Sequence, residues 1–520
     1  MSGEPSLPDP YSDPDAKAQA QLVADDVSAL QRLGYAQELR RGMSPFSNYA
    51  LSLSIICILA GGVTSFQIGY ASVGGAAIGL GWPLSCLFSL AVALTMGQVA
   101  SAFPTAGGLY HWASILGGRG WGWVTAWFNL AGLVAVLAAI NVGAYQFTVG
   151  ALGPRLGFDP AAMSPGKALA VQTVVVVLVT ASQAAVNHLG IRATTRLTDF
   201  SGYWILFVSV ALTASMLWFA PRLGWSRLIT FTNYSGARGG EVWPATPSLP
   251  WLFLLGFLLP AYTITGFDAS AHTAEETIGA SVSVPRGIVR SVLVSGLFGW
   301  LMLAALVVAA PDPDAAAAQG AGAFAWIVGA VVPTWAAVLL YAGIAAAQYL
   351  CGLATVTSAS RMAYAFARDG GLPASGALRR VSPRFRTPAA AIWATAGLSI
   401  AFTVYTPVYS TITAVCVIFL YISYVIPTAL GLVAHGRTWT AMGPWSLGRL
   451  YRPLALVSVL FCGLLLVVGV QPPNDQALGI VVGATLVLAL GWFGVEQRRF
   501  AGPPAGIMGA ERRVPSASAP

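Results

Sequence analysis

The sequence predicts an all-α polytopic membrane protein with twelve transmembrane helices. Of the 520 residues, 56% are hydrophobic and only 9% are charged, and the mean hydropathy is +0.70. A typical soluble protein is about 25% charged, and no soluble core absorbs this much apolar surface. The long apolar runs therefore indicate one polytopic bundle rather than several soluble domains.

Twelve apolar runs are long enough to cross a bilayer, which takes about 20 residues per helix. The first, third and sixth exceed a straight span, so we expect tilting or a break in each. Only a short TPVYS segment separates the ninth from the tenth, and a merger there would give eleven. The expected spans are residues 47–75, 79–102, 120–149, 168–188, 198–220, 249–275, 288–310, 333–358, 388–406, 409–434, 453–470 and 476–495.

The basic residues predict how the chain is oriented. With both termini in the cytoplasm, the inner segments hold 22 of the 27 Lys and Arg residues. This is the asymmetry of the positive-inside rule, and an eleven-span topology would remove it. The net charge of +8 is thus a topology signal and does not indicate a nucleic-acid partner. We expect a multi-pass protein of the cytoplasmic (plasma) membrane.

Outside the spans we expect little organisation. The expected parts are a cytoplasmic N-terminal tail at 1–45, a first repeat with spans one to five at 46–220, a second repeat with spans six to ten at 249–434, spans eleven and twelve at 453–495, and a cytoplasmic C-terminal tail at 496–520.

Several classes of enzyme are excluded by missing motifs. The sequence has no GxxxxGK phosphate loop, no HExxH metal pair and no GxSxG elbow. The five cysteines lie inside apolar runs without CxxC spacing, and the four histidines are isolated along the chain. We therefore expect no enzyme, no cofactor and no metal, with an intramembrane hydrolase of unfamiliar pattern as the alternative left open.

Asp268 is the acidic residue that stands out inside an apolar run. Glu275 and Glu276 follow it near the inner end of span six, and no lysine lies within any span. A carboxylate at the bilayer centre costs about 2.5–3.5 kcal/mol on insertion scales, so we expect Asp268 to face the bundle interior near the functional site. The alternative is a structural role, in which Asp268 caps free backbone N–H groups.

Two spans carry sequence that favours an unwound point near mid-membrane. In span six, the TITG segment at 263–266 is a poor helix former between two apolar halves. In span one, Gly61 and Gly62 precede Thr64 and Ser65. Irregular backbone at this depth is tolerated only inside protein or beside a wet cavity. Glycine pairs also serve as packing surfaces, but breaks in spans one and six together are typical of transporters with two inverted five-helix repeats.

Such breaks suit a small zwitterion. Half-helix N-termini present free N–H groups and about half a positive charge to an anion. Loose carbonyl groups at the other half-helix ends receive an ammonium group or a sodium ion. An amino acid fits between the two.

Five motifs occur in order along the chain: LGYAQELRRGMSPFSNYALSLSII (33–56), ASVGGAAIGLGW (71–82), SAFPTAGGLYHWAS (101–114), GFDASAHTAEET (266–277) and SRMAYAFARDGGLP (360–373). With them the chain resembles the amino acid–polyamine–organocation superfamily. Within it, the chain looks most like the amino acid/choline transporter family of fungal GABA and choline permeases and plant amino acid transporters. The resemblance covers about residues 25–500. It implies a LeuT-type fold of 5+5 inverted repeats plus two helices, and uptake or exchange by alternating access.

The resemblance also implies roles for single residues. The glycine break of span one would cradle the substrate carboxylate, Tyr262 would be an aromatic gate, and the carbonyls after it would receive the amine. On span three, Trp127 and Asn129 either line the same cavity or pack in the core. The substrate-binding residues expected in this way are Gly61, Gly62, Val63, Thr64, Tyr262, Thr263, Ile264, Thr265, Asp268, Trp127 and Asn129.

The coupling ion is left open by the sequence. Some proton-coupled relatives carry a lysine on span five, and LTDFSGYWILFVSV here has none. On span eight, Ala354, Thr357 and Ser358 share one helix face and resemble the cation site of sodium-coupled LeuT-type carriers, although Thr and Ser on membrane helices also bond their own backbone. Sodium coupling there, proton coupling through Asp268 and cation-independent exchange are the three hypotheses.

The sequence therefore predicts a secondary transporter of a small amino acid, GABA or a choline-like amine. Asp268 favours substrates with a positive end. Two alternatives belong to other classes: a non-transporting membrane sensor or chaperone-like subunit, and a channel. The pair of occluding breaks favours a carrier over both.

Overall fold

The computed structural model describes residues 14–405 and 409–504, which are α-helical without any β-strand. Residues 1–13 and 505–520 of the expected tails, and 406–408 between expected spans nine and ten, lie outside the described residues. The α-helices are α1 (Pro14–Arg32), α2 (Pro45–Ile56), α3 (Gly61–Thr64), α4 (Phe66–Val73), α5 (Trp82–Ala102), α6 (Leu109–Gly117), α7 (Arg119–Leu156), α8 (Pro165–His188), α9 (Ile191–Phe219), α10 (Leu249–Gly256), α11 (Leu258–Thr263), α12 (Ala269–His272), α13 (Ala280–Ala309), α14 (Pro313–Ala318), α15 (Ala323–Val331), α16 (Thr334–Arg368), α17 (Ser375–Leu378), α18 (Ala389–Tyr405), α19 (Tyr409–Ala434), α20 (Tyr451–Gly469), α21 (Asp475–Gly491) and α22 (Gln497–Arg499).

Helices occupy all of the expected spans, but their lengths do not confirm a count of twelve. Within the described residues, ten segments are long and apolar enough to cross a membrane. The helices of expected spans six and nine, Leu249–Thr263 and Ala389–Val404, are shorter. The first is short because the backbone leaves the helix after Thr263. The expectation of little organisation elsewhere was wrong between spans seven and eight, where α14 and α15 form.

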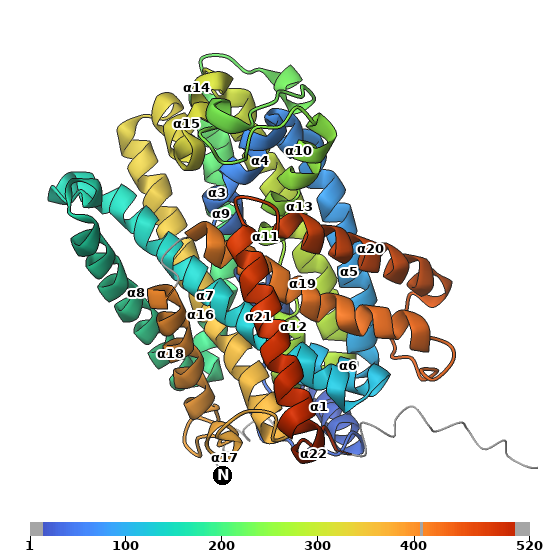
Figure 1. The fold of residues 1–520 in the computed structure, drawn as a ribbon. Helices are drawn as coiled ribbons and strands as arrows, with labels where there is room; N and C mark the ends of the chain where they lie inside the picture. Colours follow the sequence, from blue (N-terminus) through green and yellow to red (C-terminus); the bar gives the residue numbers. More distant parts are fainter. Residues whose placement is uncertain (1–13, 406–408, 505–520) are drawn as a thin grey trace, which may run out of the picture.

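The two interrupted helices lie inside the bundle. α7 packs along both α16 and α19, and α13 packs along α5 and α2. Between these long helices lie α2, α3 and α4, which together make the first broken helix, and α10, α11 and α12, which make the second. α3 contacts α11 directly, so the two interruptions meet in the middle of the fold (Figure 1).

The two ends of the bundle carry different elements. The tail end carries α1, α17 and α22, and the loop end carries residues 221–248 with α14 and α15 (Figure 1). At the tail end, the Tyr35 hydroxyl donates to Asp369 at 2.6 Å, and the Arg499 guanidinium donates to the Gly370 carbonyl at 3.3 Å. The first and last described segments therefore meet on the same side, as an even number of crossings requires.

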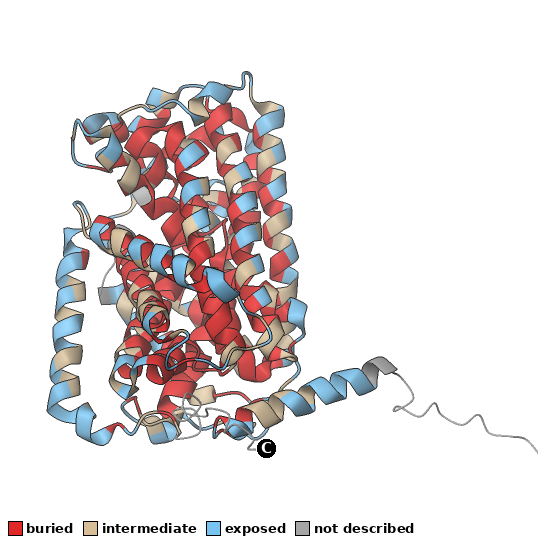
Figure 2. Ribbon diagram, turned by 90° about the vertical axis from the view of Figure 1, so that its right-hand side faces the viewer, coloured by how far each residue is buried: buried red, intermediate tan, exposed pale blue. Residues whose placement is uncertain are grey.

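The outside of the bundle is apolar. Leu87, Leu178, Phe207 and Leu490, on four different helices, are each more than 60% exposed. Figure 2 shows buried residues filling the centre and exposed ones along the rim. Apolar side chains that point outward over this much of a bundle are expected where the surrounding solvent is lipid.

Candidate functional site

The first broken helix is interrupted just before Gly61. α2 ends at Ile56, and residues 57–60 leave the helix before the chain resumes with α3. Cys57 has a φ of +25°, which L residues rarely adopt. Within the described residues, the buried amides of Ile58 and Leu59 find no acceptor. The interruption therefore precedes the glycine pair, which lies in a single helical turn and does not itself form the unwound point.

The second broken helix is interrupted where the sequence indicated. α11 ends at Thr263, Gly266 has a φ of +85°, and α12 begins at Ala269. The Gly266 amide donates to the Tyr424 hydroxyl at 3.0 Å. The Tyr421 hydroxyl reaches the Ile264 carbonyl only at 3.5 Å. The Ile264 carbonyl is thus only weakly bonded by the protein, whereas the Gly266 carbonyl accepts the Ala269 amide at 3.2 Å.

Glycine makes the contact between the two breaks possible. A Cβ on Gly61 would lie 2.6 Å from the Thr263 Cα, closer than real Cβ atoms come to backbone. Towards the tail end, Ser52 of α2 donates to the Phe267 carbonyl at 2.9 Å and bonds the Ser270 hydroxyl at 2.7 Å. Val63 of α3 is buried. The breaks are therefore held face to face by close backbone packing and hydroxyl bonds.

Asp268 lies at the centre of a buried polar cluster. Its carboxylate accepts hydrogen bonds from Asn129 of α7 at 2.9 Å and from Tyr424 of α19 at 2.7 Å. His272, one helical turn further on, places Nε2 3.1 Å from the same carboxylate. All four side chains are fully buried. The structure thus brings Asp268 and Asn129 together. The sequence analysis treated His272 as an isolated histidine, whereas the structure places it against Asp268.

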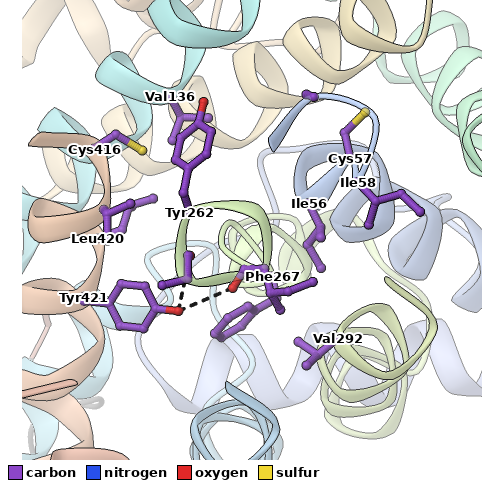
Figure 3. Packing of buried hydrophobic residues seen from close by; sticks show 14 of the residues in the cluster. Ile56, Cys57, Ile58, Val136, Tyr262, Phe267, Val292, Cys416, Leu420 and Tyr421 are labelled. Atoms are coloured by element: carbon purple, nitrogen blue, oxygen red, sulfur yellow. Dashed lines mark hydrogen bonds between the residues drawn. The ribbon is translucent and has the colours of Figure 1, made fainter. Parts of the chain in front are cut away.

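Tyr262 lies beside a cavity that opens towards the loop end. The cavity has a volume of about 280 Å³ and is bordered by Gln67 and Trp243 on one side and by Thr413 on the other. The Trp243 indole N–H donates to the Ile68 carbonyl at 2.9 Å, which holds the loop against α4. In Figure 3 the Tyr262 ring extends from the second break between Val136 and Cys416. This placement suits an aromatic gate above the breaks.

The tail end is closed below the breaks by buried ion pairs. Arg361 pairs with Glu276 at 2.9 Å, with both side chains fully buried, and Arg368 pairs with Glu275 at 2.9 Å. The Arg368 guanidinium also lies over the Tyr35 ring, 3.8 Å from its centre. These ion pairs therefore block the route to the breaks at the tail end, although a cavity of about 780 Å³ is also present at this end, lined by α1 and residues 278–283.

Trp127 does not join the other expected residues. Its ring packs edge-on against Phe366 with centroids 5.9 Å apart. It lines a separate apolar cavity between α7, α19 and α21, together with Trp123 and Leu488. A separation of two residues decides this outcome, because it points Asn129 and Trp127 to different faces of α7.

Comparison with known proteins decides the family. Residues 43–493 match the amino acid permease family. The chain belongs to that family. It is 31% identical to the amino-acid permease BAT1 of Arabidopsis thaliana, covering 83% of this chain and 86% of the relative, and 30% identical to the rice homologue of BAT1, covering 95% and 99%. It is also 28% identical to the GABA-specific permease of Saccharomyces cerevisiae, covering 87% and 79%.

Family membership confirms the expected resemblance and, with the helical structure, the LeuT-type fold of the amino acid–polyamine–organocation superfamily. The permease is a multi-pass membrane protein and belongs to a family of transporters. The relatives are named permeases and none of these names indicates an enzyme.

The expected cation residues of the permease are buried, and one is already engaged. The Thr357 hydroxyl donates to Asn187 at 2.7 Å and lies 3.1 Å from the Leu353 carbonyl. Ala354 packs with Ile55 in a small apolar cluster. The Ser358 hydroxyl has no partner among the described residues. A sodium site on this face stays a prediction.

Gln348 is a residue of the permease that the sequence analysis missed. Its Nε2 donates to the Leu59 carbonyl inside the first interruption at 3.2 Å. Its Oε1 is buried without a partner in the described structure, beside Gly143 and the Thr64 methyl group. A lone amide within the apolar run of expected span eight was the signal that could have found it.

Proposed function

We propose that this permease is a secondary active transporter that carries a small amino acid, GABA or a choline-like amine across the cytoplasmic membrane by alternating access. The observation that carries the proposal is the meeting of the two interruptions at Gly61 and Thr263. Around this contact, polar backbone groups that a continuous helix would bond are left available in the middle of an apolar bundle, which is tolerated only where the backbone is buried in protein or lines a wet cavity. A polar substrate can bind to such groups.

The available groups match a zwitterion. The free amides of Ile58 and Leu59 precede the turn of α3 and suit a carboxylate. The Ile264 carbonyl and the unpartnered Oε1 of Gln348 are acceptors and suit an ammonium group. The substrate-contact residues that we propose are Gly61, Gly62, Val63, Thr64, Tyr262, Thr263, Ile264 and Thr265, with Gln348 added and Trp127 removed.

Asp268 and Asn129 support this site without touching the substrate. The carboxylate already has three protein partners, and a carboxylate saturated in this way has little capacity left for an incoming amine. Its role is to fix the second interruption, since Tyr424 bonds both Asp268 and the Gly266 amide.

The asymmetry of the two ends corresponds to one state of an alternating-access cycle. A cavity leads from the loop end to Tyr262, and the ion pair between Arg361 and Glu276 closes the tail end. We assign the tail end to the cytoplasm because the basic residues gather there. The structure then corresponds to a state open to the outside.

Counterflow in proteoliposomes tests the proposal. Purified permease is reconstituted into vesicles preloaded in turn with unlabelled GABA, alanine, glutamate, arginine or choline, and entry of the same labelled compound is followed. A carrier gives transient accumulation of at least one compound above its external concentration. A channel gives entry without accumulation, and a sensor gives ligand-dependent thermal stabilisation without entry; either result would overturn the proposal.

A matched pair of variants ties the activity to the site. Gly61→Val forces a side chain into the Thr263 backbone, whereas Gly479→Val adds one where nothing lies within 4 Å. Counterflow is expected to be lost in the first and kept in the second. If the two variants had equal counterflow activity, the interruptions would not be part of the transport pathway.

A further inference from the structure

Asp268 and His272 form a buried pair that the proposed substrate site does not use. They lie four residues apart, both fully buried, and His272 Nε2 is 3.1 Å from Asp268 Oδ2. The other ring nitrogen, Nδ1, lies 3.2 Å from the Ala106 carbonyl oxygen. A buried, ionisable pair inside a transporter bundle marks an ion or proton pathway more often than a structural brace.

The hydrogen-bond partners fix how many protons the pair carries. A carbonyl oxygen only accepts, so Nδ1 of His272 must carry a hydrogen and donate it to Ala106. The contact between Nε2 and Oδ2 then needs one further proton. That proton resides on the histidine, giving imidazolium and carboxylate, or on the aspartate, giving neutral imidazole and carboxylic acid. In either arrangement the pair holds one exchangeable proton.

Removing that proton would cost the ring one of its two contacts. If the remaining hydrogen stays on Nδ1, the imidazole Nε2 and the carboxylate face each other at 3.1 Å as two acceptors without a donor; if it moves to Nε2, Nδ1 and the Ala106 carbonyl do so at 3.2 Å. Both side chains are fully buried, so solvent water cannot supply the missing hydrogen bond. Helix α12, which carries His272 on the tail side of the break, would therefore have to move.

Hydrogen bonds connect the Asp268–His272 pair to the interruption of the second broken helix. Tyr424 donates to Asp268 at 2.7 Å and accepts from the Gly266 amide at 3.0 Å. Asn129 donates to the other side of the carboxylate at 2.9 Å. A change in the charge of Asp268 therefore reaches the backbone of the proposed substrate site through one hydroxyl group.

The other charged groups near α12 are already neutralised. Helix α12 packs against α2, α13 and α16. From α16, Arg361 and Arg368 form ion pairs with Glu276 and Glu275. From α2, the facing groups are Ser52 and Asn48, which do not titrate. Among the described residues, Tyr424 is the one other titratable group that bonds the pair.

We propose that the Asp268–His272 pair is the coupling-proton site of this permease. It holds one proton while the tail end is closed and releases that proton towards the tail end when α12 moves away from α7 and α19. One proton accompanies each substrate molecule. This inference rests on the proposed transport function, and it names the driving ion.

The test compares two activities of the same vesicles. Labelled GABA, alanine, glutamate, arginine or choline, whichever gives the largest counterflow, is supplied to vesicles buffered to a more alkaline pH inside than outside. The ratio of proton-driven accumulation to counterflow at equal pH is measured, with trapped pyranine reporting proton entry. The wild-type protein is expected to accumulate the compound and to acidify the interior with it.

Three variants locate the proton. His272→Gln and Asp268→Asn are each expected to lower the ratio about tenfold, within the usual range for coupling between two sites. Asp199→Asn is the matched control, because this carboxylate of α9 bonds Ser47 and has no contact with either break. Its ratio is expected to equal the wild-type ratio.

The outcomes separate the two proposals. Wild-type protein without any counterflow contradicts the proposed function. Wild-type counterflow without proton-driven accumulation, or an unchanged ratio in both pair variants, overturns the coupling-proton site and leaves the proposed function in place. Loss of both activities in both variants, in protein that is still monodisperse, also contradicts the site, because coupling and exchange must then depend on the pair equally.

Discussion

The Thr263 Cα lies 2.6 Å from the place where a Cβ on Gly61 would be. This close approach of the two interrupted helices involves the backbone of both residues together with the Thr263 side chain. Neither atom can shift without moving a helix, because α3 continues into α4 and α11 packs on α5 and α19. The contact therefore fixes the distance between the two half-helix ends that face the proposed substrate.

Gly61→Ala is expected to abolish counterflow and to destabilise the protein by about 1–3 kcal/mol, the usual penalty of overpacking. Gly479→Ala is the control, since its Cβ would meet nothing within 4 Å among the described residues. Thermal unfolding in detergent and counterflow measure the two effects. Similar results for both variants would show that the close approach of Gly61 to Thr263 is not needed for transport.

Tyr424→Phe is expected to slow transport and to leave the buried Gly266 amide unsatisfied, which costs about 1–3 kcal/mol. Tyr421→Phe removes a hydroxyl that reaches carbonyls only at 3.4 and 3.5 Å, so its effect is expected to be smaller. The maximal transport rate and the melting temperature of both variants check this order. A larger loss in Tyr421→Phe would contradict the link between Asp268 and the interruption.

Arg361→Met is expected to destabilise the protein by about 3–5 kcal/mol, because the Glu276 carboxylate would stay buried without its partner. The double variant Arg361→Met/Glu276→Gln removes both charges and is expected to recover most of that loss. Thermal unfolding measures both. Arg238→Ala is the control, since its ion pair with Asp314 is well exposed and is expected to contribute no measurable stability.

The Asp26 carboxylate attaches α1 to the bundle by accepting the Gly279 amide at 2.7 Å and the Ala280 amide at 3.1 Å. Burial raises the pKa of Asp26, while Arg41 acts in the opposite direction. Asp26→Ala is therefore expected to release α1 and to speed trypsin cleavage at Arg32 or Arg40, since losing such a cap costs about 0.5–2 kcal/mol.

Asp26→Asn keeps one accepting oxygen for two amides and loses the ion pair with Arg41, so it is expected to hold α1 less firmly than the native residue and more firmly than Asp26→Ala. Asp25→Ala serves as the control, because Asp25 is exposed and bonds only within α1. The rate of trypsin cleavage compares the three variants. Faster cleavage in Asp25→Ala than in Asp26→Ala would place the attachment elsewhere.

Part of the site followed from local sequence. The TITG segment at 263–266 forms the second interruption because β-branched residues and glycine disfavour helix. Asp268 was expected to face the interior, and it does. The first interruption was placed slightly too late, since Gly61 and Gly62 serve the close approach to Thr263 and the unwound residues precede them.

The partners of Asp268 could not be predicted from the sequence. Asn129 and Tyr424 lie 139 and 156 residues away along the chain, and only the packing of α7 and α19 on the second broken helix brings them to one carboxylate. For the same reason Gln348 was missed and Trp127 was wrongly included. His272 was missed as well: the sequence analysis treated it as isolated, although a spacing of four residues from Asp268 is one that brings side chains together on a continuous helix.

The sequence alone determined that this chain lies in a membrane, which runs form helices, and which two of those helices break. These outcomes depend on hydropathy, helix propensity and the desolvation of charge, all of which act over a few neighbouring residues. Only the tertiary structure decided which side chains meet at the breaks, where buried ion pairs block the tail end, and that an aspartate and a histidine lie 3.1 Å apart. Such contacts depend on how helices that are distant in the sequence pack against one another, and a local sequence pattern does not specify which residues of another helix a given side chain will meet.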